Sequence, residues 1–494
     1  MKQIQVMSAT DPNAEYALEL LQTFSYLHFD GISEQIFERA KRNTWDYTEG
    51  SMFSATSTNR LMPSGWDQLT LAKGLRILLD FSLITVDCSR QIAMHPVVHE
   101  WSRERLSPEE RVYAWETAIS TMAMSIYIDF TSEDYKYRRM LKPHIAACLA
   151  SPEGKEILFA DGLRIEERYF IVDKLVMAYE DEGQGEVALD LHTKNLRLKR
   201  LVLQSGHHVV VDTMRRITYS LRYLERFEEA IQCHEELLEN WQAYYNITQD
   251  KLPLDLRRDL AYTCCLGGYH IRGFEIFEEV IREFTKTLGP NAATTLLSKS
   301  MQAHCLALWG RYKEAAQIQE STLVGFETTF SKMHPATLIN LDNLANSYWG
   351  LGKKKKARRL RKQTLVAIIL TFGEFHPRTL QCQTAVMNEY PLLANWKNVE
   401  ARKEVLQKAQ MNLGELHIVT LKSMSTLAEG YVEKRLPMKA KEVQERTIEC
   451  MMKAYGEEHP NTIEAKRDLV RIERILLVRK ICYWWLPKQI LDNR

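Results

Sequence analysis

Histidines supply the first candidate chemistry in this chain. His95 and His99 are four residues apart, a spacing that can place two zinc ligands on one face of a helix. Pro96 lies between them and suits the first turn of a helix, so His95 is expected to precede that helix. No glutamate follows in the H-E-x-x-H manner. We therefore predict a fold-stabilising role for this histidine pair and no metal site.

A second set of histidines recurs with a regular period. They are His334, His376, His417 and His459, and each precedes a threonine-aliphatic pair. The five pairs are Thr295-Leu296, Thr337-Leu338, Thr379-Leu380, Thr420-Leu421 and Thr462-Ile463, and only the first has no such histidine. Successive pairs are 42, 42, 41 and 42 residues apart. A catalytic histidine occurs once, in one pocket. Histidines at the same corner of every unit are therefore expected to be structural.

This period indicates stacked helix pairs, each too small to bury its apolar face alone. Small residues recur near the start of each second helix, where two helices must approach closely: Ala188, Ala230, Gly273, Ala315, Ala357, Ala401 and Ala440. We predict a superhelix over 166–482 with seven pairs, at about 167–204, 209–246, 253–288, 292–330, 334–372, 376–413 and 417–455. A charged capping helix follows at about 460–480, and 483–494 is expected to be a tail. Pro391 should interrupt the sixth pair.

The repeats resemble tetratricopeptide repeats of the kinesin-light-chain type. The resemblance rests on H-P-x-T-L openings, as at His334, on the Leu344-Ala345 and Tyr348 core, on the Gly352 break and on the Ala357 contact. It covers about 210–480 clearly and 165–210 weakly. It implies an α-solenoid whose first helices line a concave groove.

The first 110 residues have a different pattern. Two helices, a polar loop at about 43–65, a helix capped by Asp67, a hairpin and a last helix from Pro96 are expected. The first two helices are placed at 15–29 and 32–42, and the two strands of the hairpin at 82–86 and 91–94. This order is a winged-helix plan, and 111–165 is expected to be a helical connector.

This segment resembles the winged-helix portion of fungal signal-transducing NTPases of the NB-ARC (STAND) type. The resemblance rests on Leu20-Leu21 through Ser33 and on Met94-His95 through Trp101. It implies a nucleotide contact for His95, although Pro96 replaces the aspartate of the family motif. The chain has no Gly-x-x-x-x-Gly-Lys-Ser/Thr string to cradle phosphates. The chain is thus expected to be the C-terminal part of such a protein, or a descendant that lost its nucleotide-binding domain. A nucleotide role would need that domain to be supplied by another chain.

The tetratricopeptide resemblance also gives candidate ligand-binding residues. The residue after the small core position of each first helix should face the groove: Arg222, Tyr262, His304, Asn346, Asn388 and Glu429. One turn earlier lie Arg258, Ser300, Asp342, Thr384 and Ser425. Such a ladder could hydrogen-bond an extended peptide, and the asparagines can both donate and accept. The alternative is that these are ordinary solvated residues.

Charge and composition narrow the class of partner. The net charge is +1, so no global field favours nucleic acid or membranes. Nine scattered cysteines without a C-x-x-C pair argue against a disulfide framework. Eight basic residues lie between Lys353 and Lys362; they are interpreted as a solvated helix face, with a nuclear-import signal or phosphate contact as the alternative.

Together these patterns predict a mostly α protein without catalytic activity or cofactor. Its function is expected to be protein or peptide binding in the concave groove, in the cytoplasm. The alternative is the sensor part of a nucleotide-switched ATPase. The sequence does not indicate the oligomeric state.

Overall fold

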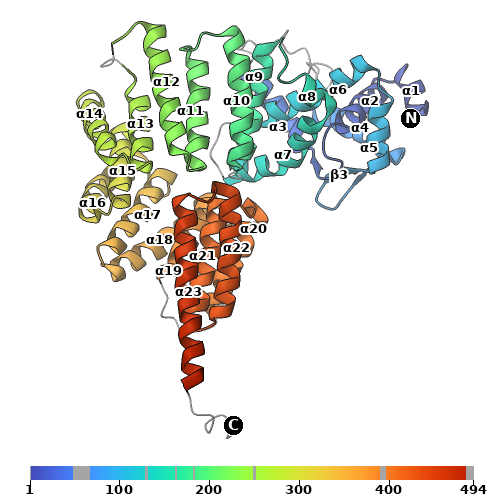
Figure 1. Cartoon of the computed structure of the whole chain (residues 1–494). Helices are drawn as coiled ribbons and strands as arrows, with labels where there is room; N and C mark the ends of the chain where they lie inside the picture. Colours follow the sequence, from blue (N-terminus) through green and yellow to red (C-terminus); the bar gives the residue numbers. More distant parts are fainter. Residues whose placement is uncertain are drawn as a thin grey trace. The chain divides into compact units, whose positions relative to one another are not determined.

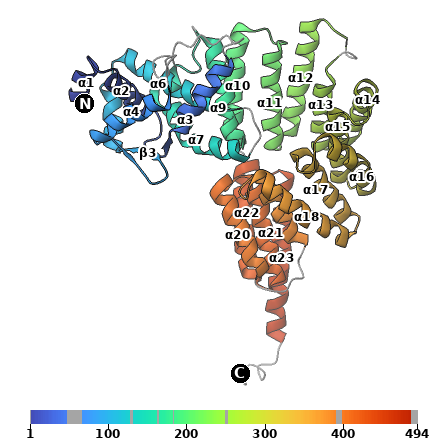
Figure 2. The ribbon, with the colours of Figure 1, turned by 180° about the vertical axis from the view of Figure 1, so that it is seen from behind.

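A computed structural model describes residues 2–47, 67–127, 132–161, 164–181, 184–248, 252–389 and 397–485. The chain is mainly helical (Figures 1 and 2). It divides into two compact units. Unit 1 is Met1–Asp181, Gly185–Ile217 and Ala243–Tyr245, and unit 2 contains Thr218–Gln242 and Asn246–Arg494. We describe each unit separately.

Unit 1 begins with helices that surround a small sheet. Its elements are α1 (Lys2–Ser8), α2 (Pro12–Phe24), β1 (Ile32–Ser33), α3 (Gln35–Tyr47), α4 (Gln68–Asp80), β2 (Ile84–Val86), β3 (Gln91–Met94), α5 (Pro96–Glu104), α6 (Pro108–Ser125), α7 (Ser132–Ala150), α8 (Pro152–Glu156), α9 (Ile165–Asp181) and α10 (Gly185–Val202).

The sheet has the strand order β1-β3-β2, and both pairings are antiparallel. Ile32 lies opposite Ile92, and Ile84 lies opposite Met94; all four side chains are buried. The hairpin and the Asp67 cap are as predicted: Asp67 Oδ1 accepts the Thr70 backbone N–H at 2.8 Å. The prediction missed β1, because a two-residue strand has no measurable alternation. The winged-helix assignment stays a prediction, and the loop predicted at 43–65 lies mostly outside the described residues.

One apolar core runs from α2 and α4 through α6 and α7 to α9 and α10. Trp115 is its largest fully buried side chain, and its indole N–H donates to the Cys148 carbonyl at 3.1 Å. A Tyr26 carbonyl in turn accepts from the Cys148 thiol. The segment predicted as a connector is therefore helical, as expected, and it belongs to this core.

The remaining helices form successive packed pairs. They are α11 (His208–Tyr223), α12 (Phe227–Tyr245), α13 (Leu254–Leu266), α14 (His270–Leu288), α15 (Ala293–Leu308), α16 (Tyr312–Thr329), α17 (Pro335–Gly350), α18 (Lys354–Phe372), α19 (Pro377–Glu389), α20 (Lys397–Leu413), α21 (Ile418–Glu433), α22 (Pro437–Tyr455) and α23 (Pro460–Trp485). Their bounds confirm the predicted fold class and match the seven predicted pairs, with α9 and α10 as the first. Pro391 lies outside the described residues, and α23 continues into the segment predicted as a tail.

The small residues lie where the pairs touch. Ala230, Ala315, Ala357 and Ala440 have no exposed surface. At Gly273 a Cβ atom would lie 2.4 Å from Cys265 Sγ and 2.7 Å from the Ala261 carbonyl oxygen. Any side chain there would push the two helices apart, which explains the glycine. Among the described residues no helix is long and apolar enough to cross a membrane.

Candidate functional site

The repeated histidines cap the first helices. His334 Nδ1 accepts the backbone N–H of Ala336 at 3.1 Å, and the other three histidines make the same bond two residues on, at 3.0, 3.0 and 3.2 Å: His376, His417 and His459. An N-cap acceptor satisfies one of the free N–H groups at a helix start. The structural interpretation of these histidines therefore has a geometric basis.

The buried threonines close the preceding turn. Thr337 donates to the Ser331 carbonyl at 2.7 Å, and Thr379 donates to the Gly373 carbonyl at 2.7 Å. Thr295 and Thr462 bond to the carbonyl six residues earlier in the same way. Thr420 is the exception, because its buried hydroxyl has no partner among the described residues. The H-P-x-T-L opening is thus a turn-and-cap device.

Three of the groove candidates meet on the first helices of successive pairs. The Tyr262 hydroxyl lies 3.0 Å from His304 Nδ1, and the two groups form a hydrogen bond. The Arg222 guanidinium lies over the Tyr262 ring at 5.4 Å, and its Nη1 is buried without a hydrogen-bond partner among the described residues. The ladder predicted from spacing therefore brings these three side chains together.

The electrostatics of this group reflect its enclosure. Burial, with the charges of Arg378 and Lys422 second, lowers the pKa of His304 to about 4. Burial also raises the pKa of Tyr262 to about 12. Both groups are therefore neutral at neutral pH. Arg378 and Lys422 are secondary causes of the lowered pKa of His304, and Arg222 and Arg378 oppose the raised pKa of Tyr262, so cations from α11, α19 and α21 lie near these two side chains.

The other groove candidates differ from one another. Asn346 is exposed, and its side-chain oxygen accepts from Arg361 Nη2 at 2.6 Å. Its amide N–H groups and the second lone pair of the oxygen remain for a ligand. Glu429 is exposed and its pKa is raised by partial burial; Arg471 lies 3.9 Å away. The side chain of Asn388 lies outside the described residues.

Most residues one turn earlier serve the framework. Arg258 pairs with Asp255 at 2.6 Å and with Asp259 at 3.1 Å. Ser300 donates to Asn340, and Thr384 bonds to Ser423. All three side chains are buried. The bonds of Ser300 and Thr384 join neighbouring first helices, whereas Arg258 pairs with acids of its own helix, α13. Ser425, the last of the set, is only half-buried.

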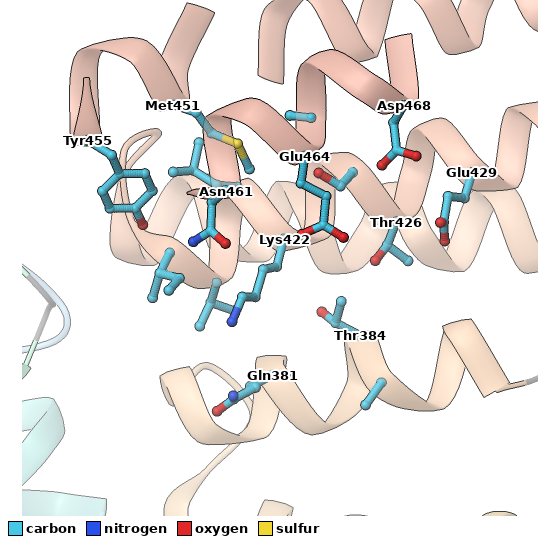
Figure 3. A pocket seen from close by; sticks show the side chains of 16 residues that line it. Gln381, Thr384, Lys422, Thr426, Glu429, Met451, Tyr455, Asn461, Glu464 and Asp468 are labelled. Carbon is cyan, nitrogen blue, oxygen red and sulfur yellow. The ribbon is translucent and has the colours of Figure 1, made fainter. Parts of the chain in front are cut away.

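A pocket of about 340 Å³ lies between α19, α21, α22 and α23 (Figure 3). Its lining includes apolar side chains, among them Val419, Leu421 and Met451. Most of its polar side chains come from α19, α21 and the capping helix α23: Gln381 and Thr384 from α19, Lys422, Ser425, Thr426 and Glu429 from α21, and Asn461, Glu464 and Asp468 from α23. Figure 3 shows Lys422 pointing toward α19, with Glu464 and Asp468 above it. Sequence spacing identified Thr384, Ser425 and Glu429 but missed Lys422 and Glu464.

Lys422 and Glu464 occupy equivalent positions of successive first helices, 42 residues apart. No ion pair is described for either side chain within the ranges that the structure covers. Lys422 precedes the predicted groove residue Glu429 by seven residues, which is about two helical turns. The same rule, applied to the first helices, would have found Lys422.

Second helices carry a polar ladder that the sequence analysis missed. Gln319, Arg361, Arg402 and Gln444 are spaced by 42, 41 and 42 residues, and each is at most 1% exposed. Arg361 Nη1 donates to Asp342 at 2.6 Å, and Arg402 Nη1 donates to the Thr426 carbonyl at 2.6 Å. The first bond joins α17 and α18 within one pair, and the second joins α20 to α21 of the next pair.

Arg361 also corrects the interpretation of the basic run 353–362 as a wholly solvated face. Lys356 lies 4.1 Å from the centre of the Tyr348 ring, and Lys354 and Arg358 lie over Trp349 at 5.3 and 5.6 Å. Several of these charges are therefore bound to aromatic rings of the same repeat. The nuclear-import alternative stays a prediction.

His95 and His99 have separate roles in unit 1. His95 is exposed, and its Nδ1 caps α5 by accepting the Val97 N–H at 3.2 Å. His99 Nε2 lies 2.8 Å from the Leu27 carbonyl, and burial lowers the His99 pKa. Within the described part of the chain no cluster of His, Cys, Asp and Glu could hold a metal ion. A nucleotide contact for His95 stays a prediction.

No protein-family model and no curated protein matches the chain. Several solved structures are similar at low identity. The nearly identical TPR-like repeats of a Podosopora anserina protein assigned to the kinesin light chains are 22% identical, over 40% of this chain and 93% of theirs, with a TM-score of 0.33. A Rap protein complexed with Competence and Sporulation Factor is 12% identical, over 77% and 91%, with a TM-score of 0.41.

A STAND protein with a tetratricopeptide repeat sensor from Pyrococcus horikoshii is 15% identical, over 92% of this chain and 64% of its own, with a TM-score of 0.37. The class of this protein is defined by its own helices. The paired and capped helices from α11 to α23 form a tetratricopeptide-like α-solenoid.

Proposed function

We propose that this protein is an interaction scaffold that binds a peptide or protein segment in the pocket between α19, α21 and α23. The observation that carries the proposal is the pocket itself. It is a cavity of about 340 Å³ lined by α19, α21, α22 and α23, and its lining combines apolar and charged side chains. A peptide ligand needs both features, because apolar contact supplies affinity and a few polar groups fix orientation.

The charges of the pocket suit a segment that carries both signs. Glu429, Glu464 and Asp468 offer carboxylates, and Lys422 offers an ammonium group. Lys422 and Glu464 are without a described ion-pair partner, so a bound segment would meet charges that the fold has not already neutralised. The proposed binding surface continues on the first helices of earlier repeats, where Arg222, Tyr262 and His304 lie.

Peptide selection tests this function. A random peptide library displayed on phage would be panned against the full chain, and selected peptides would be measured by fluorescence anisotropy. Ser425→Trp fills the pocket, and Lys422→Glu reverses its one ammonium charge. We expect each change to weaken binding by at least about tenfold, since a few anchor positions dominate such interfaces.

Lys355→Glu is the matched control, because Lys355 is exposed on α18 and outside the pocket lining. It makes the same charge change and should leave the dissociation constant unchanged. Peptides that bind the two lysine variants equally well would contradict the proposed pocket. Circular dichroism confirms that each variant keeps its helical content.

A further inference from the structure

Two contacts in unit 2 join residues that are far apart in the sequence. The Tyr223 hydroxyl is hydrogen-bonded to His417 Nε2, 194 residues away, and their rings lie 5.5 Å apart. Glu225 Oε2 accepts from Asn461 Nδ2 at 2.7 Å, 236 residues away, and lies 3.0 Å from His459 Nε2. We call these five residues the clasp.

The clasp differs from ordinary contacts between repeats. In a solenoid each repeat contacts only its neighbours. Tyr223 and Glu225 lie at the end of α11 and in the turn before α12, whereas the other three residues begin α21 and α23. The clasp therefore connects the second helix pair to the seventh pair and to the capping helix. All five residues belong to unit 2.

These contacts are largely shielded from water. The side chains of Glu225 and His459 are 16% and 12% exposed, and His417 is 4% exposed. The Tyr455 ring stacks on His459 at 4.8 Å, and burial, followed by the charge of Glu225, raises the Tyr455 pKa. Glu225 also has a φ of 57°, in the left-handed region, which a non-glycine residue adopts at a cost.

The clasp also borders the ligand pocket. Asn461 and Tyr455 line the pocket, and Figure 3 places them side by side at one end of it. Glu225 holds Asn461 directly, and it contacts His459, on which the Tyr455 ring stacks. A change at Glu225 therefore alters the pocket wall without altering a lining residue.

We propose that Tyr223 and Glu225 are positioning residues that close unit 2 on itself and hold the Asn461–Tyr455 wall of the pocket in place. The two residues act through the caps of α21 and α23. In both caps, His417 and His459, Nδ1 accepts the backbone N–H that starts the helix. The contacts with Tyr223 and Glu225 therefore use the other ring nitrogen, Nε2.

Hydrogen exchange measured by mass spectrometry tests the closure on the full chain. Glu225→Gln removes the charge, and Tyr223→Phe removes only the hydroxyl. We expect amides of residues 455–463 to exchange about tenfold faster in Glu225→Gln, because a charge-assisted bond that holds this segment is weakened. Tyr223→Phe should act on residues 417–424.

Glu229→Gln is the control for Glu225→Gln. Glu229 lies four residues further along, and its exposed carboxylate pairs with Arg226. Its variant should exchange like the wild type in both segments. Unchanged exchange in Glu225→Gln and Tyr223→Phe would overturn the proposal.

A double-mutant cycle separates the clasp from simple loss of a cap. Asparagine is a good N-cap residue, so His459→Asn keeps the capping bond and loses the contact with Glu225. The effects of Glu225→Gln and His459→Asn on exchange should be non-additive, because each removes the same contact. Glu225→Gln and His334→Asn should be additive, since His334 caps α17 without touching the clasp. Additivity in both cycles would refute the clasp.

The closure needs no ligand, so its test is independent of the proposed function. If Lys422→Glu loses peptide binding and its amides exchange hydrogen at the wild-type rate, the result supports the pocket and leaves the clasp unaffected. Faster exchange in Glu225→Gln concerns the clasp, whether or not a peptide has been found.

Discussion

The middle repeats of unit 2, α15 to α18, and its last repeats, α21 to α23, begin their first helices with similar residues and use them differently. His334 caps a helix, whereas His417 and His459 cap a helix and also hold the second pair. Thr337 bonds to a turn carbonyl, whereas Thr420 is buried without a described partner. A repeat motif thus fixes a local bond, and the position of the repeat in the array decides what else the same side chain contacts.

The two regions should differ most in the stability lost when the buried polar residue of a second helix, Arg361 or Gln444, is replaced. Arg361 in the middle repeats neutralises Asp342, which is 4% exposed, whereas Gln444 in the last repeats donates one neutral bond to the Ala465 carbonyl at 2.9 Å. Arg361→Met leaves a buried carboxylate unpaired and should lower the free energy of unfolding by about 3–5 kcal/mol. Gln444→Met should cost about 1–2 kcal/mol. Urea unfolding followed by circular dichroism measures both, and equal losses would contradict the comparison.

The pH dependence of stability should report the buried cap of the last repeats. Burial lowers the pKa of His417 to about 4, below the value of about 6.5 in an unfolded chain. Between these values the unfolded chain binds more protons, so stability is present above pH 6.5 and is lost as the pH falls toward 4. The loss is on the order of 3 kcal/mol for His417, and His304 and His376 act in the same direction.

Urea midpoints measured from pH 7.5 to pH 4 check this prediction. His417→Asn keeps a capping side chain that does not titrate, so it should flatten the pH profile. A profile of unchanged slope in this variant would show that His417 is not a source of the acid sensitivity.

Threonine-to-valine changes should separate the two regions by a smaller amount. Thr337→Val removes the hydroxyl that bonds the Ser331 carbonyl at 2.7 Å and should cost about 1–2 kcal/mol. Thr420→Val removes a buried hydroxyl without a described partner, so it should be neutral or stabilising by up to about 1 kcal/mol. Thermal and urea unfolding provide the measurement. A loss at Thr420 as large as that at Thr337 would show that its hydroxyl has a partner.

The smallest expected effect lies in the turn before each first helix. Ser331 has a φ of 86°, where Gly414 and Gly456 in the last repeats have 85° and 90°. Ser331→Gly should stabilise the chain by about 1 kcal/mol by removing backbone strain, and Gly414→Ser should destabilise it by a similar amount. No atom lies within 4 Å of a Cβ built at Gly414, so its cost reflects the backbone alone. Differential scanning calorimetry should show shifts of opposite sign; shifts of the same sign would exclude strain as the cause.

Sequence spacing predicted the helix pairs to within a few residues because each bond that defines them is local. His334 bonds an amide two residues away, and Thr337 bonds a carbonyl six residues away. The candidate site was predicted less completely. Glu429 and Ser425 line the pocket, but Lys422 and Glu464 were missed because a charged residue on a helix is most often a solvated one. Arg361 was missed for the same reason, within a run of exposed lysines.

The sequence by itself determined the period, the caps, the small contact residues and hence the class of fold, because these depend on neighbours within one or two repeats. Only the tertiary structure decided that Glu225 meets His459 and Asn461, and that α19, α21 and α23 enclose a pocket. Such contacts depend on small rotations between repeats that accumulate along the array. No residue type records that accumulated rotation, so its result is visible only in the folded chain.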